Sequence, residues 1–293
     1  MMSNVAYLND PFERHNLESE AIFGIKECPV YFHDGAVFAK NDQFKQIVRK
    51  VSSEHSIPLG LVGKGFAAVE NSEFFGAVEE AIRDRMDISG VTVRDDVAYG
   101  GARCRRTYTF RNYATEPAVG DIVAFKLWAW NAFDGSLAFR VGAGGERLVC
   151  LNGMTTSNDV DVTVRKHTSG VTISGLTSRI PQYVANFEKQ AESWGKWTNK
   201  KISSQDVQHL IEAFPGISKR LGESIGLEYY KQVRETGETL WTLYNVMTFF
   251  ASHNSEQFAV RNTTNDNEAY SLYQRERRVL AWQNTPAFAR LAA

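Results

Sequence analysis

The pattern of hydrophobic and polar positions predicts an irregular start, a strand-rich middle and a helical end for this chain of 293 residues. The first forty residues are rich in loops. Apolar residues then recur at helical spacing over residues 44–51 and again over 74–86, which predicts two amphipathic helices. Ser72 is the expected N-cap of the second helix, and residues 59–69 have the pattern of a strand interrupted by glycines. The apolar residues of the first helix are Phe44, Ile47, Val48 and Val51.

Strands dominate the pattern from about residue 90 to residue 174. Short apolar runs follow one another there and are separated by turn sequences such as Phe133-Asp134-Gly135, as in antiparallel hairpins. Beyond Arg179 the helical period returns and continues toward the end of the chain. We therefore expect an α+β fold: a central, mostly antiparallel twisted sheet with flanking helices and a largely helical C-terminal third. The expected organisation is a single domain over residues 1–293, with 57–178 as its sheet-rich core and 179–293 packing on that core or on a neighbouring protomer.

The segment from Arg103 to Arg111, RCRRTYTFR, places basic and aromatic side chains on one predicted strand. Side chains on a strand alternate between two faces. One face therefore carries Arg103, Arg105, Thr107, Thr109 and Arg111, and the other carries Cys104, Arg106, Tyr108 and Phe110. Arginines spaced along a strand can meet successive phosphates while rings stack on unpaired bases, so the segment is a candidate nucleic-acid contact. The alternative is a solvated outer strand face, with Tyr108 and Phe110 in the core.

Positive charge is concentrated in the middle of the chain. The formal net charge is -1, but it divides into -6 over residues 1–96, +4 over 97–180 and +1 over 181–293. A protein that coats duplex DNA by bulk attraction would carry a larger positive charge. A local patch is nevertheless sufficient for binding, because the field depends on where the charges lie. The alternative is a chance unevenness of charge.

More cations and rings occur on the strands that follow this segment. Lys126, Trp128 and Trp130 alternate along one predicted strand, and further cations lie on later strands. Sequence-tolerant binding of single strands needs this combination of positive charge and flat rings. Taken singly, each tryptophan is more simply explained as core packing. The expected nucleic-acid-binding residues are Arg103, Arg105, Arg106, Tyr108, Arg111, Lys126, Trp128, Trp130, Arg140, Arg147, Arg165 and Lys166.

No convincing catalytic or metal-binding set stands out in the sequence. The glycines between residues 60 and 65 do not have phosphate-loop spacing, and neither a GxSxG nor an HExxH motif occurs. Asp159 and Asp161 form a DxD pattern without an obvious third ligand, so we interpret them as solvated strand-edge residues. Cys28, Cys104 and Cys150 are far apart, and we expect free thiols. We expect no catalytic residue, no metal and no cofactor, although triads assembled from distant residues stay open.

Three segments resemble a known family of phage and plasmid proteins. They are IPLGLVGKGFAAVENSEFFGAVEE, NAFDGSLAFRVGAGGERLVCLNGM and TLWTLYNVMTFFASH, and they lie between about residues 57 and 253. In amino-acid sequence and in order they are similar to segments of the family catalogued as the domain of unknown function numbered 932. The segment from Asp134 to Met154 is the most specific part of the resemblance. The resemblance implies a mixed α/β fold and a phage or plasmid context, and it names no activity.

By overall type the chain is also similar to the single-stranded-DNA-binding transcription regulators (Drc type) of enquatrovirus-type podoviruses. That resemblance implies a protein that assists a phage RNA polymerase on exposed single strands. It rests on size and general pattern, so no residue is carried over from it. A phage RNA polymerase is accordingly a candidate protein partner. The bacterial host cytoplasm is the expected location, since the chain shows neither a secretion signal nor a run of roughly 18 apolar residues for a membrane span.

The leading hypothesis from the sequence is a phage-encoded, non-enzymatic protein that binds single-stranded DNA through the central sheet. It would act in phage transcription, replication or recombination, and we expect a homo-oligomer because one protomer offers a limited groove. Three alternatives stay open. They are a single-strand annealing protein, a metal-dependent nuclease using Asp159 and Asp161, and an interaction protein that binds a polymerase and touches DNA weakly.

Overall fold

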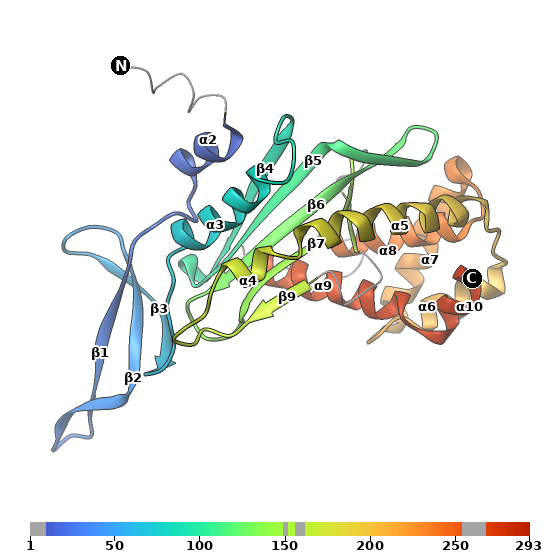
Figure 1. Ribbon diagram of the computed structural model, residues 1–293. Coiled ribbons are helices and arrows are strands. Elements are labelled where there is room, and N and C mark those ends of the chain that lie inside the picture. The colour runs from blue at the N-terminus through green and yellow to red at the C-terminus, as the bar shows by residue number, and fades with distance from the viewer. Residues whose placement is uncertain (1–9, 149–151, 156–161, 254–267) are drawn as a thin grey trace.

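The computed structural model describes residues 10–148, 152–155, 162–253 and 268–293. A large antiparallel sheet occupies the middle of the molecule, helices lie on both of its faces, and a smaller sheet projects from one end (Figure 1). The last third of the chain is mostly helical. The α+β fold expected from the sequence is therefore confirmed. No helix in the described ranges is both long and apolar enough to cross a membrane.

The projecting sheet, which we call the arm, consists of three antiparallel strands in the order β1-β2-β3. The strands are β1 (Ile25–His33), β2 (Phe38–Lys50) and β3 (Ser56–Gly63). The helix predicted over residues 44–51 is wrong, because that stretch belongs to β2. The register between β2 and β3 shifts between Ile47 and Val48, so these consecutive residues are both buried. The register shift in β2 therefore gives its buried residues a spacing that resembles that of a helix, which explains the wrong prediction.

Within the described residues the large sheet contains six strands, with the path β4-β5-β6-β7-β8 and with β9 also paired to β7. The strands are β4 (Val91–Ala98), β5 (Arg103–Ala118), β6 (Asp121–Ala132), β7 (Phe139–Arg147), β8 (Asn152–Thr155) and β9 (Val162–Arg165). A 3-10 turn, η1 (Tyr99–Gly101), joins the first two strands. This region is the strand-rich middle that the sequence predicts, and the β5 register of Arg105 opposite Trp130 and Arg106 opposite Ala129 confirms the predicted alternation of faces.

Helices precede and follow the sheet. They are α2 (Pro11–Glu18), α3 (Asn71–Arg83), α4 (Ser174–Thr177), α5 (Ile180–Asn199), α6 (Ser204–Glu212), α7 (Lys219–Thr236), α8 (Leu240–Ser252), α9 (Glu268–Gln283) and α10 (Pro286–Ala292). Helices α2 to α5, α8 and α9 pack on the sheet, and α6, α7 and α10 pack on other helices. Three details differ from expectation, and one of them is that β1 lies within the first forty residues. The loop-rich start contains α2, capped by the Asp10 carboxylate, and α3 begins at Asn71, so Ser72 lies inside that helix and is not its N-cap.

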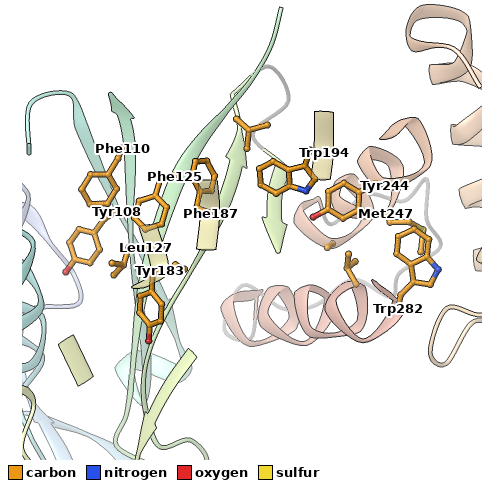
Figure 2. Close-up of a cluster of buried hydrophobic side chains, with 14 of the residues drawn as sticks. Tyr108, Phe110, Phe125, Leu127, Tyr183, Phe187, Trp194, Tyr244, Met247 and Trp282 are labelled. Carbon is orange, nitrogen blue, oxygen red and sulfur yellow. The ribbon is translucent and has the colours of Figure 1, made fainter. Parts of the chain in front are cut away.

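One face of the large sheet forms the main hydrophobic core. Tyr108, Phe110, Phe125 and Leu127 project from β5 and β6 toward helices α2 to α5, and they are fully buried (Figure 2). The same cluster continues through Trp194 of α5 into the helical bundle. Because burial of apolar area is the main favourable contribution to folding, this continuous cluster joins the sheet and the helical third.

Candidate nucleic-acid interface

Arg106, at the centre of the basic segment, is fully buried on the core face of β5. Its guanidinium binds Asp95 of β4 through two hydrogen bonds of 2.8 Å, from Nε to Oδ1 and from Nη2 to Oδ2. Nη1 donates to Glu79 of α3 at 2.8 Å and to Asn16 of α2, and Nη2 donates to Ser19 at 3.0 Å. Arg106 therefore connects the sheet to the first two helices, and its donors are directed at the protein.

The electrostatic balance around Arg106 favours the ionised forms of Arg106 and Asp95. Burial alone would raise the pKa of Asp95, but hydrogen bonds from Arg106, His15 and Ser19 outweigh burial and hold that pKa below its usual range. Burial alone would lower the pKa of Arg106, and Asp95 outweighs it in the same way. Tyr108 donates to Glu79 at 3.2 Å, and burial raises its pKa well above the ordinary value. This is the pattern of a structural ion network.

The opposite face of β5 carries a second buried ion cluster. Arg105 is 1% exposed and pairs with Glu276 of α9 at 3.0 Å, and Lys126 of β6 approaches the same carboxylate at 3.3 Å. Burial alone would raise the pKa of Glu276, but the two cations outweigh it and lower the pKa to about 2. A carboxylate of α9 thus occupies the position that a phosphate would need in order to reach this face.

The rings expected to stack on bases also lie beneath α9. Trp128 and Trp130 are buried, and both make edge contacts with Tyr273 of α9, at centroid distances of 6.4 and 5.7 Å. The half-buried Arg140 guanidinium lies 5.3 Å from the centre of the same Tyr273 ring. The structure therefore brings five predicted residues together on one face, as the alternation implied, but a helix covers them.

Arg103 and Arg147 also bind carboxylates of the protein itself. Arg103 donates through Nε to Asp134 at 2.8 Å, and its guanidinium lies 4.6 Å from the centre of the Tyr99 ring. Arg147 is buried and donates to Asp121, which also accepts a 2.8 Å hydrogen bond from the indole of Trp241 in α8.

These contacts correct the expected interface. A solvent-accessible role is wrong for seven residues in this conformation, since their side chains are buried within the protein: Arg105, Arg106, Tyr108, Lys126, Trp128, Trp130 and Arg147. Arg103 and Arg140 are partly buried. The central sheet consequently presents neither of its faces as an open groove along residues 103–110.

Three predicted cations do reach solvent: Arg111, Arg165 and Lys166. Arg111 lies eight residues along β5 from Arg103, a strand distance of about 26 Å. Arg165 and Lys166 lie at the end of β9, next to the base of the arm. The Ala67 amide just after β3 donates to the His167 carbonyl at 3.1 Å, and Phe66 forms a bridge with Thr168.

The tip of the arm holds rings that the sequence reasoning missed. Tyr31 and Phe38 are 50% and 70% exposed, and their rings stack with centroids 5.1 Å apart and planes 4° from parallel. Lys40 is the cross-strand partner of Tyr31, and His33 is the partner of Phe38, so all four side chains share one face. We call this set the ring face. The sequence signal was the pair of apolar runs flanking Asp34-Gly35, a common hairpin turn.

The other side of the same hairpin tip is apolar. Phe32 pairs with Ala39, Val30 pairs with Asn41, and Val37 continues this face by alternation. Phe32 and Val37 are each about half exposed, at 49% and 51%. We call these residues the apolar face of the tip. The two sides of the hairpin thus differ in chemistry, one offering rings with cations and the other offering hydrocarbon.

The remaining sequence predictions concern metals and cysteines. No group of three or more potential metal ligands occurs within the part of the chain that the structure describes. Asp159, Asp161 and Cys150 lie outside the described residues, so the interpretation of the DxD pattern stays a prediction. Cys28 and Cys104 are free thiols, and burial raises the pKa of Cys104 to about 12.

Comparison with known proteins gives a family but no activity. A family model described as "Domain of unknown function (DUF932)" matches residues 58–275, which include all the strands of the large sheet and most of the helical third. No curated protein and no solved structure matches the chain.

Proposed function

Since the chain belongs to the DUF932 family, whose description names no activity, we propose from its exposed chemistry that it binds single-stranded DNA through the arm and the arm base. The observation that carries the proposal is the stacked, solvent-exposed pair of Tyr31 and Phe38 beside Lys40. Exposed rings are costly to leave in water, and a nucleobase covers a flat ring without requiring a particular sequence. The proposal keeps the expected ligand and moves the binding surface away from the central sheet.

The arrangement of positive charges on the arm supports a contact with the phosphate backbone of a DNA strand. Lys40 is exposed, and its ion pair with Asp42 spans 3.3 Å at the surface, where such pairs contribute little and exchange readily. Lys64, Arg165 and Lys166 are exposed near the other end of the arm. From Lys40 to Phe44, where β2 meets the end of β3, the strand covers at most about 13 Å. A single strand that stacks at the tip can therefore place later phosphates near these cations.

Binding to duplex DNA is expected to be weaker. The bases of a duplex are already stacked on one another, and unstacking them so that they can contact protein rings costs a few kcal/mol per base step. The sequence-independent phosphate attraction remains, so affinity for single strands is expected to fall as salt rises. The few exposed cations of the arm imply a modest salt slope, of roughly two to three released ions.

The test is a fluorescence anisotropy titration with a labelled single strand of about ten nucleotides and with the matching duplex, at about 50 and about 200 mM salt. The wild type should prefer the single strand. The double variant Tyr31→Ala/Phe38→Ala should lose roughly 10-fold or more in affinity, because each stacking contact contributes about 1–3 kcal/mol.

Phe32→Ala is the matched control. Phe32 is adjacent to Tyr31 and equally exposed, but it lies on the apolar face and should leave affinity for the short strand unchanged. Arg165→Ala/Lys166→Ala should lower affinity and reduce the salt slope while preserving the preference for single strands. Equal affinity for both DNA forms, or equal losses in the ring-face and Phe32 variants, would remove the proposal.

A further inference from the structure

The turn that joins β4 to β5 holds an exposed tyrosine in a strained backbone conformation. Tyr99, the first residue of η1, has a φ of 53°, and among the residues that the structure describes it alone combines a side chain with a positive φ. Gly100 and Gly101 follow it with φ at 66° and 109°. Tyrosine rarely adopts this left-handed region, and such strain persists only where the surrounding structure fixes it. The fold therefore keeps Tyr99 where asparagine or glycine would be less strained.

Contacts with the arm fix this turn in place. The Arg49 guanidinium of β2 donates to the Gly100 carbonyl at 3.2 Å. Gly100 also faces β3, since a Cβ added there would lie 3.5 Å from the Ile57 side chain. A Cβ at Gly101 would lie 2.7 Å from the Phe23 ring, so glycine allows this close approach. The backbone of the turn is thus held against the end of the arm that adjoins the large sheet.

The Tyr99 ring is exposed and yet held in one orientation. The residue is 42% exposed, and the Arg103 guanidinium lies over its ring, 4.6 Å from the centre. Asp134 accepts a 2.8 Å hydrogen bond from Arg103 Nε and so fixes the cation. Within the described residues no second ring contacts that of Tyr99, which leaves the remaining face to solvent. An exposed ring that is already ordered loses little conformational freedom when a flat partner stacks on it.

The groups around the ring select the class of ligand. The guanidinium groups of Arg49 and Arg103 both lie against the turn. They disfavour a cationic partner for the free face of Tyr99 and attract a phosphate. A flat ring beside cations is the combination that sequence-tolerant binding of unpaired bases uses. An unpaired nucleotide therefore fits this site better than a cationic or purely aliphatic group.

We propose that Tyr99 is a second stacking platform for single-stranded DNA, where it binds one unpaired base on the face opposite Arg103. The inference rests on the proposed function and extends its binding surface from the arm tip to the large sheet. Strand β2 connects the two platforms, because Lys40 lies on the ring face and Arg49 adjoins the turn. The strand between these two residues covers at most about 30 Å. A stacked single strand spans that distance with about nine nucleotides.

The test compares strand lengths in Tyr99→Asn. Asparagine accepts the left-handed conformation better than tyrosine and has no ring, so the variant should keep the wild-type circular dichroism spectrum and melting temperature. In fluorescence anisotropy its affinity for a labelled strand of about twelve nucleotides should fall roughly 5-fold or more, the loss expected for one stacked base. Affinity for a strand of about four nucleotides, which cannot reach both platforms, should change less than about 2-fold. Tyr99→Phe keeps the ring and should bind both strands as the wild type does.

Photochemical crosslinking gives a second readout on the unaltered protein. Strands of about twelve nucleotides that carry iodouracil at successive positions should crosslink to Tyr99 at positions several nucleotides away from those that crosslink to Tyr31 or Phe38. The inference is overturned if Tyr99→Asn binds the longer strand like the wild type, if Tyr99→Phe loses as much affinity as Tyr99→Asn, or if the tip rings crosslink and Tyr99 does not. Lost affinity in Tyr99→Asn with full affinity in Tyr31→Ala/Phe38→Ala would instead remove the role of the arm tip and keep the platform at Tyr99.

Discussion

Replacement of Arg106 by methionine tests whether the basic segment has a structural role. Arg106→Met keeps a long side chain that can still pack on the Phe75 ring, which lies 4.7 Å from the guanidinium. The variant loses the charge and all the hydrogen bonds of that group. Asp95 and Glu79, with side chains 8% and 1% exposed, would then remain buried without their cation.

The expected loss of stability is large. Removal of one partner from a buried ion pair typically costs about 3–5 kcal/mol, because the other charge is left without compensation. For a chain of this size, each kcal/mol lowers the melting temperature by about 2 °C, so a decrease of roughly 6–10 °C is expected. Arg111→Met is the matched control, since Arg111 is on the same strand but exposed, and its stability should change by less than about 0.5 kcal/mol.

The pH dependence gives a second readout. In the wild type the pKa of Asp95 is held low, so its carboxylate stabilises the folded state above the ordinary pKa and loses that effect as pH falls. In Arg106→Met burial raises the pKa of Asp95, and protonation then relieves the buried charge. The stability gap between variant and wild type should therefore narrow from pH 7 to pH 4 in urea unfolding. An unchanged melting temperature together with lost DNA binding would refute the structural assignment.

Three further predictions concern other parts of the fold. His167 packs 3.7 Å from the Phe139 ring, and burial lowers its pKa to about 4, so the unfolded state takes up the proton first. Wild-type stability should thus fall by up to about 3 kcal/mol between pH 6.5 and pH 4, and His167→Gln should flatten the part of this slope above pH 4.5, measured by urea unfolding. Glu276→Gln leaves two buried cations without their carboxylate and should cost about 3 kcal/mol or more; an unchanged urea midpoint would contradict the cluster. Gly60→Ala would place Cβ 2.3 Å from the Asp134 Cα, so thermal unfolding should show a loss of about 1–3 kcal/mol or more, and unchanged stability would contradict this close approach.

Local patterns predicted the strands and helices wherever one period dominated the sequence. The turn at Phe133-Asp134-Gly135 does separate β6 from β7, and the helical period after Arg179 marks the start of α5 at Ile180. The prediction was wrong over residues 44–51, where the register shift in β2 makes consecutive apolar residues face the interior. Such a shift depends on the neighbouring strand, which the local pattern does not contain.

The basic middle of the chain shows why accessibility could not be predicted. The excess of positive charge over residues 97–180 is real, but the carboxylates that pair with Arg105, Arg106 and Lys126 come from outside that segment. Glu79 and Asp95 precede the segment, and Glu276 lies 96 residues beyond its end at residue 180. Net charge by segment cannot show which distant carboxylates fold against the cations. The exposed rings of the arm were missed for the related reason that short apolar runs look like core strands unless their surroundings are known.

By itself the sequence determined the α+β class, the strand-rich middle, the helical end and the alternation of side chains along β5, because these follow from backbone periodicity over a few residues. Only the tertiary structure decided that Arg105 and Arg106 lie inside, that α9 covers the tryptophans, and that the arm presents Tyr31 and Phe38 to solvent. The physical reason is that burial and ion pairing depend on contacts between residues far apart in the chain. Those contacts locate the surface available to a partner.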